Sequence, residues 1–455
     1  MSETPLIAIF DVGKTNAKLS LVDVAAGRET WSVRRANAVV QGAGGRELDV
    51  EGIETWLLES LRTAPGKERI AVFVPIAHGA AAVLVDLEGE ILAAPDYEDT
   101  CFDEVSAEYA LLRDPYSTTF SPSLPHGLNL GRQLFHLQMR RPELFGRAAH
   151  VLLYPQYWAW RLSGVMASEV TSLGTHTDLW RPYERVYSGL ARKQGWPRML
   201  PPQRSASDRL GRIRDSVVAA TGVPAACEVA CGIHDSNASY LRFLIDRERE
   251  AFTVVSSGTW TIVMANRGDL RRLREDRDML ANVNAFGAPV ATARYMGGRE
   301  YEAIARGGEE PTIDAVVDVM SRGVMALPSF ASAGPYSGRS GRIESSADLD
   351  GAQRAALATL YSTLMTSLLI ESLGSAGEIF VDGPLARNPL FPRLLAACVP
   401  VGTVRTYAEG GGTRVAAHLG RERAPVADVP LSVAPLRLPG LLDYQANWRH
   451  RLEEK

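Results

Sequence analysis

Two short apolar runs, each broken by a polar turn, stand out along the chain. Residues 6–10 (LIAIF) are apolar, and apolar and polar residues alternate from Ala17 onward. Strict alternation is typical of a β-strand with one buried face. The segment therefore predicts a strand, a tight turn at DVGKTN (11–16) and a second strand, with the polar groups in the turn.

The same order returns near residue 251. An apolar run (251–255) leads into Ser-Ser-Gly-Thr (256–259), after which TWTIVM (259–264) resumes a β-rich pattern. Gly13 and Gly258 hold equivalent positions, 245 residues apart. Self-similarity of this kind indicates an internal duplication, so we expect two domains that each open with a strand–turn–strand unit.

Periodicity also predicts the elements between and after these two units. The proline-rich and then charged residues 430–455 indicate a surface tail. Elsewhere the patterns predict strands at 69–76 and 378–384, a hairpin at 81–92, and helices at 129–162, 230–245, 353–374 and 388–399.

Length and composition narrow the class of protein. A chain of 455 residues with 22% charged residues and a formal net charge of -4 predicts a globular protein of two or three domains. It has no polybasic run, which disfavours nucleic-acid and membrane surfaces. There is no run of about 18 apolar residues, and MSETP does not resemble a signal peptide. Four cysteines without a C-x-x-C pair are expected to be reduced thiols, as in the cytoplasm.

The tripeptide Gly13-Lys14-Thr15 is similar to part of a Walker A motif. That motif needs a glycine five residues before Gly13, where this chain has Ala8, and a helix after the threonine. The alternating residues 17–22 predict a strand instead. We therefore reject a P-loop, and no Rossmann glycine motif is present either.

A phosphate-binding hairpin is the alternative for this turn. Its backbone N–H groups can hold anionic oxygens, and Gly13 allows close backbone approach. Thr15 and Asn16 can donate hydrogen bonds, while Lys14 can add positive charge. Taken alone, the turn is explained equally well as a plain β-hairpin. The second turn at 256–259 favours a pair of turns that hold a nucleoside triphosphate.

Two acidic residues could complete such a site. Asp11 ends the first apolar run, and a carboxylate there can hold Mg2+ through water. Asp235 lies in GIHDSNA (232–238), at the start of a predicted helix. An aspartate at that point can cap the helix, or it can be the base that takes the proton from a substrate hydroxyl. The residues alone leave both explanations open.

The order and spacing of these segments resemble the FGGY carbohydrate kinases over residues 6–420. IAIFDVGKTNAKLSLVD is similar to the family's first phosphate motif, VVSSGTWTIV to its second, and CGIHDSNAS to its catalytic-aspartate motif. FVDGPLARNPLFPRLLA is similar to the adenosine segment, YAEGGGTRVAAHLG to the stretch that follows it, and YPQYWAWRLSGVMASEVTSLGT (154–175) to a helix–turn segment.

The resemblance implies an α/β protein of two RNase-H-like (actin-like ATPase) domains with the active site in the cleft between them. Residues 1–245 would form the N-terminal domain with the sugar side, the first phosphate turn and the base. Residues 246–430 would form the nucleotide-binding C-terminal domain, and 431–455 a tail. ATP with Mg2+ would be the donor, with Asp235 as the general base. The implied cofactor contacts are Asp11 (to magnesium, through water), Gly13, Lys14, Thr15, Asn16, Gly258, Thr259, Gly383 and Asn388.

On the sugar side, the resemblance implies contacts from His78 and Gly79, which follow a predicted strand, and from His234 beside the base. A buried histidine with a purely structural role explains either histidine equally well. The chain departs from the family at three points. The family's second signature, an Arg-Ala…Glu-Gly stretch, is not visible in the predicted helix 353–374. The segment GPLARN (383–388) keeps only the ends of the glycine-rich adenosine segment, and Gln156 stands where many members have aspartate.

Ile-His-Asp combined with Ser-Ser-Gly-Thr-Trp is similar to the L-rhamnulose and L-fuculose kinase branch. This likeness implies that a small ketose, of that type or a pentulose, is phosphorylated. A polyol kinase of the glycerol or erythritol type would share the fold, and a non-catalytic actin-like nucleotide sensor would be indifferent to sugars. The expected partners are a small-molecule sugar and ATP or ADP, with neither nucleic acid nor membrane. A homodimer is one of the assemblies left open.

Overall fold

The structure is a computed structural model that describes residues 4–307, 309–344, 348–399, 402–407, 411–422 and 429–454. Residues 408–410, part of the YAEGGG stretch, lie outside the described residues. The chain forms two compact units, and each gathers three separate stretches, whereas the sequence predicts continuous domains. Unit 1 comprises Met1–Arg247, Ala281–Pro289 and Gly410–Ala427, and unit 2 comprises Glu248–Leu280, Val290–Glu409 and Asp428–Lys455.

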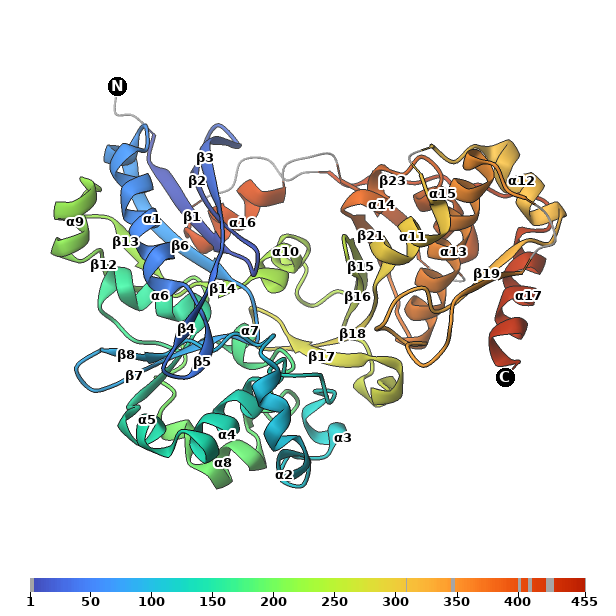
Figure 1. The fold of residues 1–455 in the computed structure, drawn as a ribbon. Helices are drawn as coiled ribbons and strands as arrows, with labels where there is room; N and C mark the ends of the chain where they lie inside the picture. Colours follow the sequence, from blue (N-terminus) through green and yellow to red (C-terminus); the bar gives the residue numbers. More distant parts are fainter. Residues whose placement is uncertain are drawn as a thin grey trace. The chain divides into compact units, whose positions relative to one another are not determined.

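Within the described residues, unit 1 is built on a seven-stranded mixed sheet (Figure 1). β1, β2 and β3 form an antiparallel meander, and β6 pairs with β1 in parallel. β13 and the short β14 both pair with β6 in parallel. The strands in spatial order are β12 (Arg209–Arg212), β13 (Glu228–Ala230), β6 (Ile70–Ala77), β1 (Leu6–Val12), β2 (Asn16–Asp23) and β3 (Arg28–Ala36), with β14 (Ile233–His234) beside β6.

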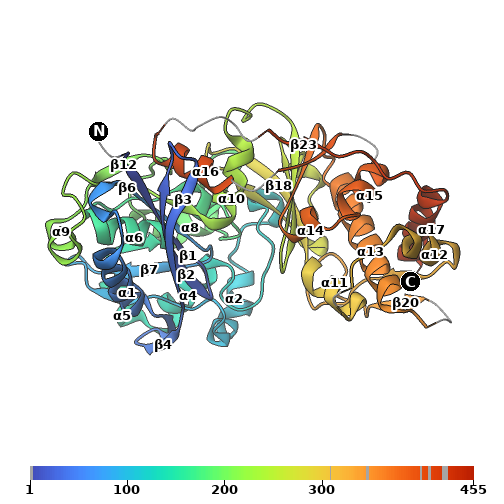
Figure 2. The same ribbon diagram turned by 90° about the horizontal axis from the view of Figure 1, so that it is seen from above.

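Helices cover both faces of this sheet (Figures 1 and 2). On one face Phe10 packs edge-on against Trp158, with ring centroids 5.2 Å apart. On the other face Gly420 fits so closely that a Cβ there would lie 2.3 Å from Cδ1 of Ile7. Burial on both faces explains why residues 6–10 form a continuous apolar run. The first face carries α1 (Val50–Thr63) and α6 (Tyr154–Ser163), and the second carries α10 (Asp235–Leu244) and α16 (Gly411–Leu419).

Unit 2 repeats the arrangement of unit 1. β15, β16 and β18 form the antiparallel meander, and β21 and then β22 add in parallel beside β15. The order β18-β16-β15-β21-β22 thus matches β3-β2-β1-β6-β13. The predicted duplication is confirmed, and both units have the RNase-H-like α/β arrangement. The strands in spatial order are β17 (Met279–Val283), β18 (Pro289–Tyr295), β16 (Thr261–Asn266), β15 (Phe252–Ser257), β21 (Glu378–Asp382), β22 (Val404–Thr406) and β23 (Leu431–Ser432).

The long helix α13 (Gly351–Ser372) is the centre of the helical layer of unit 2. Asp350 and Gln353 form a capping box at its start, and most of its residues are buried. It packs against α11 (Gly297–Ala305), α12 (Ile313–Ser321) and α15 (Phe391–Cys398). In the described part of the chain, no helix is both long and apolar enough to cross a membrane.

Two predicted segments differ from the structure. The stretch 129–162 is not wholly helical, because β9 (His150–Leu153) interrupts it and pairs with β7 (Ala82–Val85). β9 has three apolar residues in a row between two helices and shows no alternation, so periodicity alone could not separate it from them. The helices on either side are α4 (Leu130–Arg140), α5 (Pro142–Arg147) and α6.

The prediction of a surface tail at 430–455 is wrong for its last part, which forms α17 (Leu441–Glu453). Tyr444, Trp448 and Leu452 recur at helical spacing and are all buried. Nε1 of Trp448 donates to the carbonyl of Ala326 at 2.7 Å. Proline and charge dominate the composition of the segment and hide this apolar stripe.

We predict that Trp448→Ala destabilises the protein by about 3–5 kcal/mol, because it removes a side chain that is only 1% exposed and leaves a cavity. Denaturant unfolding of the full chain measures the change. Leu442→Ala on the same helix is the matched control, since Leu442 is 61% exposed. Equal effects of the two substitutions would mean that α17 is not part of the core.

Candidate active site

Three parallel strand ends in unit 1 gather most of the predicted site residues. The register pairs the ends of β1 and β14 with the end of β6. Because the carboxyl ends of parallel strands meet at one edge of a sheet, functional side chains collect there. Asp11 near the end of β1, His78 and Gly79 after β6, and His234 and Asp235 at the end of β14 therefore share one edge.

Asp235 occupies the first position of α10, not its cap. The cap position is His234, which makes no side-chain capping bond. Oδ1 of Asp235 accepts from the backbone N–H of Ser236 at 2.5 Å and from its hydroxyl at 3.2 Å. It also lies 3.2 Å from Nε2 of His234. Oδ2 has no hydrogen-bond partner among the described residues, and the side chain is 36% exposed. One carboxylate oxygen is therefore fixed and the other is open.

His234 orients the carboxylate of Asp235 as a neutral imidazole. Burial lowers the pKa of His234. Its Nδ1 lies 3.2 Å from Nδ2 of Asn237, which can only donate, so the proton of the neutral ring is assigned to Nε2. That N–H points to Asp235. Gly79 leaves the space for this ring, because a Cβ there would lie 2.7 Å from Nε2 of His234.

Gln156 holds the loop that precedes His234 and Asp235. Its Nε2 donates to the carbonyls of Cys231 and Gly232, at 3.1 Å each. Gly232 has φ +87°, and a Cβ there would lie 2.5 Å from the carbonyl oxygen of Pro75. Only glycine can adopt this positive φ and lie this close to Pro75 without strain. A carboxylate at position 156 could not donate to two carbonyls, so the glutamine suits the loop geometry of this chain.

A buried acid, Glu169, lies close to the segment that carries Asp235, and the sequence did not reveal this placement. The backbone N–H of His234 donates to Oγ1 of Thr171 at 3.1 Å. That hydroxyl and the N–H of Thr171 donate to Oε2 of Glu169, at 2.5 and 2.9 Å. Glu169 is fully buried, and burial raises its pKa to about 8. Glu169 is thus linked through Thr171 to the backbone of His234, the residue before Asp235.

Asp11 lies close to the negative charge of Asp235. Burial, and then the charge of Asp235, raise the pKa of Asp11 to about 6, while Lys18 and Arg34 partly oppose the shift. A cation near both carboxylates would stabilise the ionised form of Asp11.

The first turn is closed by a bond from the N–H of Gly13 to the carbonyl of Asn16, at 2.9 Å. Gly13 is half-buried, whereas Thr15 and Asn16 are exposed. Nδ2 of Asn16 donates to Oγ1 of Thr15 at 3.0 Å. Nδ2 of Asn37 donates to the carbonyl of Gly13 at 2.8 Å, a support that sequence did not reveal.

Lys14 points to an acidic pair and not into solvent at the turn. Its Nζ bonds with Asp96, lies 3.6 Å from Glu98, and sits 4.8 Å from the ring centre of Tyr97. Asp96 is fully buried. Burial alone would raise the pKa of Asp96, but bonds from Lys14, the Glu98 N–H and Arg46 lower it on balance. Lys14 thus ties the first turn to residues 96–98.

His78 stands beside the same stretch. Its ring lies 5.7 Å from that of Tyr97 and 5.0 Å from that of Tyr154. Nδ1 is 2.9 Å from the carbonyl oxygen of Gly79, and burial lowers the pKa of His78. Nε2 has no hydrogen-bond partner within the described residues. A neutral imidazole with one nitrogen in use can bond a hydroxyl with the other.

In unit 2, the second turn is joined to the predicted adenosine segment. Oγ of Ser257 donates to the carbonyl of Asp382 at 2.6 Å and accepts from the N–H of Leu385 at 2.9 Å. Gly383 has φ +79°, and a Cβ there would lie 2.0 Å from the carbonyl oxygen of Ser257. Glycine at 383 therefore allows the ends of β15 and β21 to approach closely.

Gly258 and Thr259 are exposed at the turn itself. Gly298, at the start of α11, lies so close that a Cβ would be 2.4 Å from the carbonyl oxygen of Gly258. The side chain of Asn388 is engaged within unit 2. Its Nδ2 donates to Thr359 at 3.2 Å, and its Oδ1 accepts from the N–H groups of residues 390 and 391.

We predict that Glu169→Gln removes a pH dependence of stability. The folded pKa of Glu169, about 8, lies above its ordinary value of 4.5, so folding is favoured while the carboxyl is protonated. That stabilisation is lost as pH rises from about 4.5 to 8, by at most about 1.4 kcal/mol per pH unit. The free energy of unfolding, measured from pH 5 to 8, should fall more steeply for the unsubstituted protein than for the variant.

The exposed Glu59 of α1 provides the matched control. Glu59→Gln should keep the slope of the unsubstituted protein. If Glu169→Gln also keeps it, the carboxyl is not buried as described.

Comparison with known proteins extends these observations over the whole chain. The family described as "Carbohydrate kinase FGGY, C-terminal domain" matches residues 249–427. A carbohydrate kinase from Novosphingobium aromaticivorans superimposes with a TM-score of 0.91 at 34% identity, covering 99% of this chain and 99% of that one.

More distant solved structures share the fold. A ligand-bound xylulose kinase from Lactobacillus acidophilus has a TM-score of 0.76 at 16% identity, over 98% of this chain and 96% of that one. Plasmodium falciparum glycerol kinase with ADP has a TM-score of 0.75 at 14% identity, over 99% and 98%. Since one relative of 34% identity spans the whole chain, the protein belongs to the FGGY carbohydrate kinases, phosphotransferases with an alcohol group as acceptor that use ATP.

Proposed function

We propose that this kinase transfers the γ-phosphate of ATP to a hydroxyl of a small ketose, with Asp235 as the general base. The observation that carries the proposal is the asymmetry of the Asp235 carboxylate. Oδ1 receives three donors, from His234 and Ser236, while Oδ2 stays open on a side chain that is 36% exposed. A base must be held in place and still reach its proton, and this arrangement meets both needs.

The chemistry needs one proton acceptor and an aligned nucleophile. Oδ2 of Asp235 would take the proton of the sugar hydroxyl while the hydroxyl oxygen forms its bond to the γ-phosphorus. The bond between the γ-phosphorus and the bridging oxygen breaks, and ADP leaves. Phosphoryl transfer depends mainly on positioning and charge stabilisation. His234 and Thr171 would contribute the positioning by holding the base.

Magnesium is the metal that this edge of the sheet suits. Asp11 is the residue that would hold it, since the pKa of Asp11 is raised to about 6 by burial and by the charge of Asp235. No group of three or more His, Cys, Asp or Glu side chains in the described residues could cage a metal. Mg2+ commonly keeps several waters and binds through one carboxylate and substrate phosphates. When bound, it would supply positive charge to the phosphate oxygens.

The two turns would bind the phosphates of ATP. Gly13, Thr15 and Asn16 would contribute from the first turn, and Gly258 and Thr259 from the second. Thr15, Asn16, Gly258 and Thr259 are exposed at the two turns, which supports this role. Lys14 would contribute by holding the first turn in place, because its side chain forms an ion pair with Asp96.

Gly383 and Asn388 would lie near the adenosine. Of the two, Gly383 has the better support, since Ser257 joins its segment to the second turn. The bonds of Asn388 to residues 359, 390 and 391 give its side chain a structural role as well.

The sugar would contact His78, Gly79 and His234. The open Nε2 of His78 and the neighbouring ring of Tyr97 offer one polar and one apolar surface. We favour a ketose of the L-rhamnulose, L-fuculose or pentulose type. Xylulose kinases are among the proteins that share the fold. The four free cysteines favour the cytoplasm.

We predict that Asp235→Asn lowers kcat by about 10²–10⁴-fold, because an amide cannot accept the hydroxyl proton. ATP affinity should stay within about threefold, since the substitution keeps the shape of the side chain. Coupled ADP release measures the rate and titration calorimetry the affinity. Asp23→Asn, at the last residue of β2, is the control and should match the unsubstituted enzyme. Activity within a few-fold of the unsubstituted enzyme would rule out Asp235 as the base.

Substrate class is decided by ADP release over a panel of acceptors. We expect L-rhamnulose, L-fuculose, D-xylulose or L-ribulose to give kcat/KM at least about tenfold above glycerol and erythritol, since buried polar groups reject ligands that leave them unpaired. Preference for glycerol or erythritol would favour a polyol kinase. ATP hydrolysis that no acceptor changes would favour a nucleotide sensor.

A further inference from the structure

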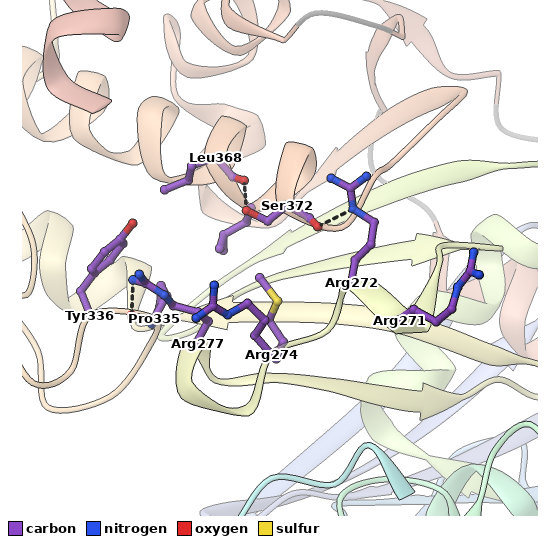
Figure 3. A pocket seen from close by; sticks show the side chains of 10 residues that line it. Arg271, Arg272, Arg274, Arg277, Pro335, Tyr336, Leu368 and Ser372 are labelled. Atoms are coloured by element: carbon purple, nitrogen blue, oxygen red, sulfur yellow. Dashed lines mark hydrogen bonds between the residues drawn. The ribbon is translucent and has the colours of Figure 1, made fainter. Parts of the chain in front are cut away.

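One cavity in unit 2 is lined by none of the residues predicted to bind ATP or sugar. Its volume is about 510 Å³, within the range of small-molecule sites. Figure 3 shows arginine side chains along one side of it and the end of α13 along the other. The lining residues are Arg271, Arg272, Arg274, Arg277, Met279, Pro335, Tyr336, Leu368, Leu369 and Ser372.

The four arginines come from one short segment between β16 and β17, but they differ in their partners. Arg271 pairs with Asp269 at 2.9 Å, and Arg274 with Asp276 at 2.7 Å. Each of these acids lies two residues away along the chain, and both pairs are exposed. Their positive charge is already matched.

Among the described residues, neither Arg272 nor Arg277 forms an ion pair. Asp269 and Asp276, which pair with Arg271 and Arg274, act on them only at longer range. Arg272 donates from Nε to the carbonyl of Ser372 and from Nη2 to that of Glu371, both at 3.1 Å. Arg277 donates from Nη1 to the carbonyl of Pro335 at 3.2 Å. Figure 3 shows the bond of Arg272 to Ser372 and the bond of Arg277 to Pro335 at opposite ends of the cavity. A carbonyl orients a guanidinium but does not neutralise it.

The ring of Tyr336 also restrains Arg277. The guanidinium of Arg277 lies 4.7 Å from the ring centre of Tyr336, and Arg339 lies 5.3 Å from the same centre. Met279 and Leu369 are 3% and 1% exposed and form an apolar floor. An arginine that is already oriented loses less freedom when it binds an anion, and its planar fork matches phosphate oxygens.

We propose that this cavity binds a small molecule carrying a phosphate or pyrophosphate group, with Arg272 and Arg277 as its anchors. The apolar floor and Tyr336 would contact the carbon part of the ligand. The site is independent of the kinase reaction, because none of its residues belongs to the turns or to the edge that carries Asp235.

Pyrophosphate is the probe, titrated by calorimetry into the full chain at constant free Mg2+. The protein is first saturated with a non-hydrolysable ATP analogue, which occupies the catalytic phosphate positions. Binding should persist under saturation. Arg272→Gln with Arg277→Gln should weaken it at least about tenfold, as expected for two charge-assisted bonds. Arg271→Gln with Arg274→Gln, an equal change of charge in the same segment, should alter it less than about threefold.

Leu368→Glu is a second variant that leaves every arginine contact in place. It adds a carboxylate to the wall of the cavity and should abolish binding without lowering Tm by more than a few degrees. Loss of pyrophosphate binding on saturation with the ATP analogue would assign the anion to the catalytic turns and overturn the proposal. If the two double arginine substitutions weaken pyrophosphate binding equally, the binding reflects general electrostatic attraction. That result would also overturn the proposal.

Discussion

The parallel pairing of β14 with β6 fixes the edge of the sheet on which the rest of the site depends. β14 has only two residues, and its last one lies beside the end of β6. A helix starts immediately afterwards, so Asp235 directly follows the strand pair and is the first residue of α10. Two residues of strand cannot hold this position alone. Gln156, Thr171 and the positive φ of Gly232 supply the remaining restraint.

Burial sets the charges around that edge. It lowers the pKa of His78 and of His234, and it raises the pKa of Glu169 to about 8. His78, His234 and Glu169 are thus held neutral, while the charge of Asp235 contributes to the raised pKa of Asp11. An edge of this kind attracts a cation and offers one open carboxylate oxygen. Those are the two properties that a kinase needs beside its acceptor hydroxyl.

Much of this was predictable from sequence because the relevant signals are local. Continuous apolar runs and polar turns gave the two hairpins, and their repetition gave the duplication that the strand order confirms. Signals that depend on tertiary contact were missed. β14 is too short for any periodicity, and Lys14 meets Asp96 across 82 residues of sequence. Glu169 and Thr171 do show the short acid-x-Thr spacing of a local hydrogen bond, but their link to His234 spans distant segments. The helix α17 was hidden by its polar composition.

The most direct measurement is a crystal structure of the enzyme with its preferred acceptor and a non-hydrolysable ATP analogue. The account predicts that the reacting hydroxyl lies about 2.6–3.2 Å from Oδ2 of Asp235, with Oδ1 still bonded to Ser236 and His234. A hydroxyl bound on the Oδ1 side, or an Asp235 side chain turned away from the acceptor, would contradict it.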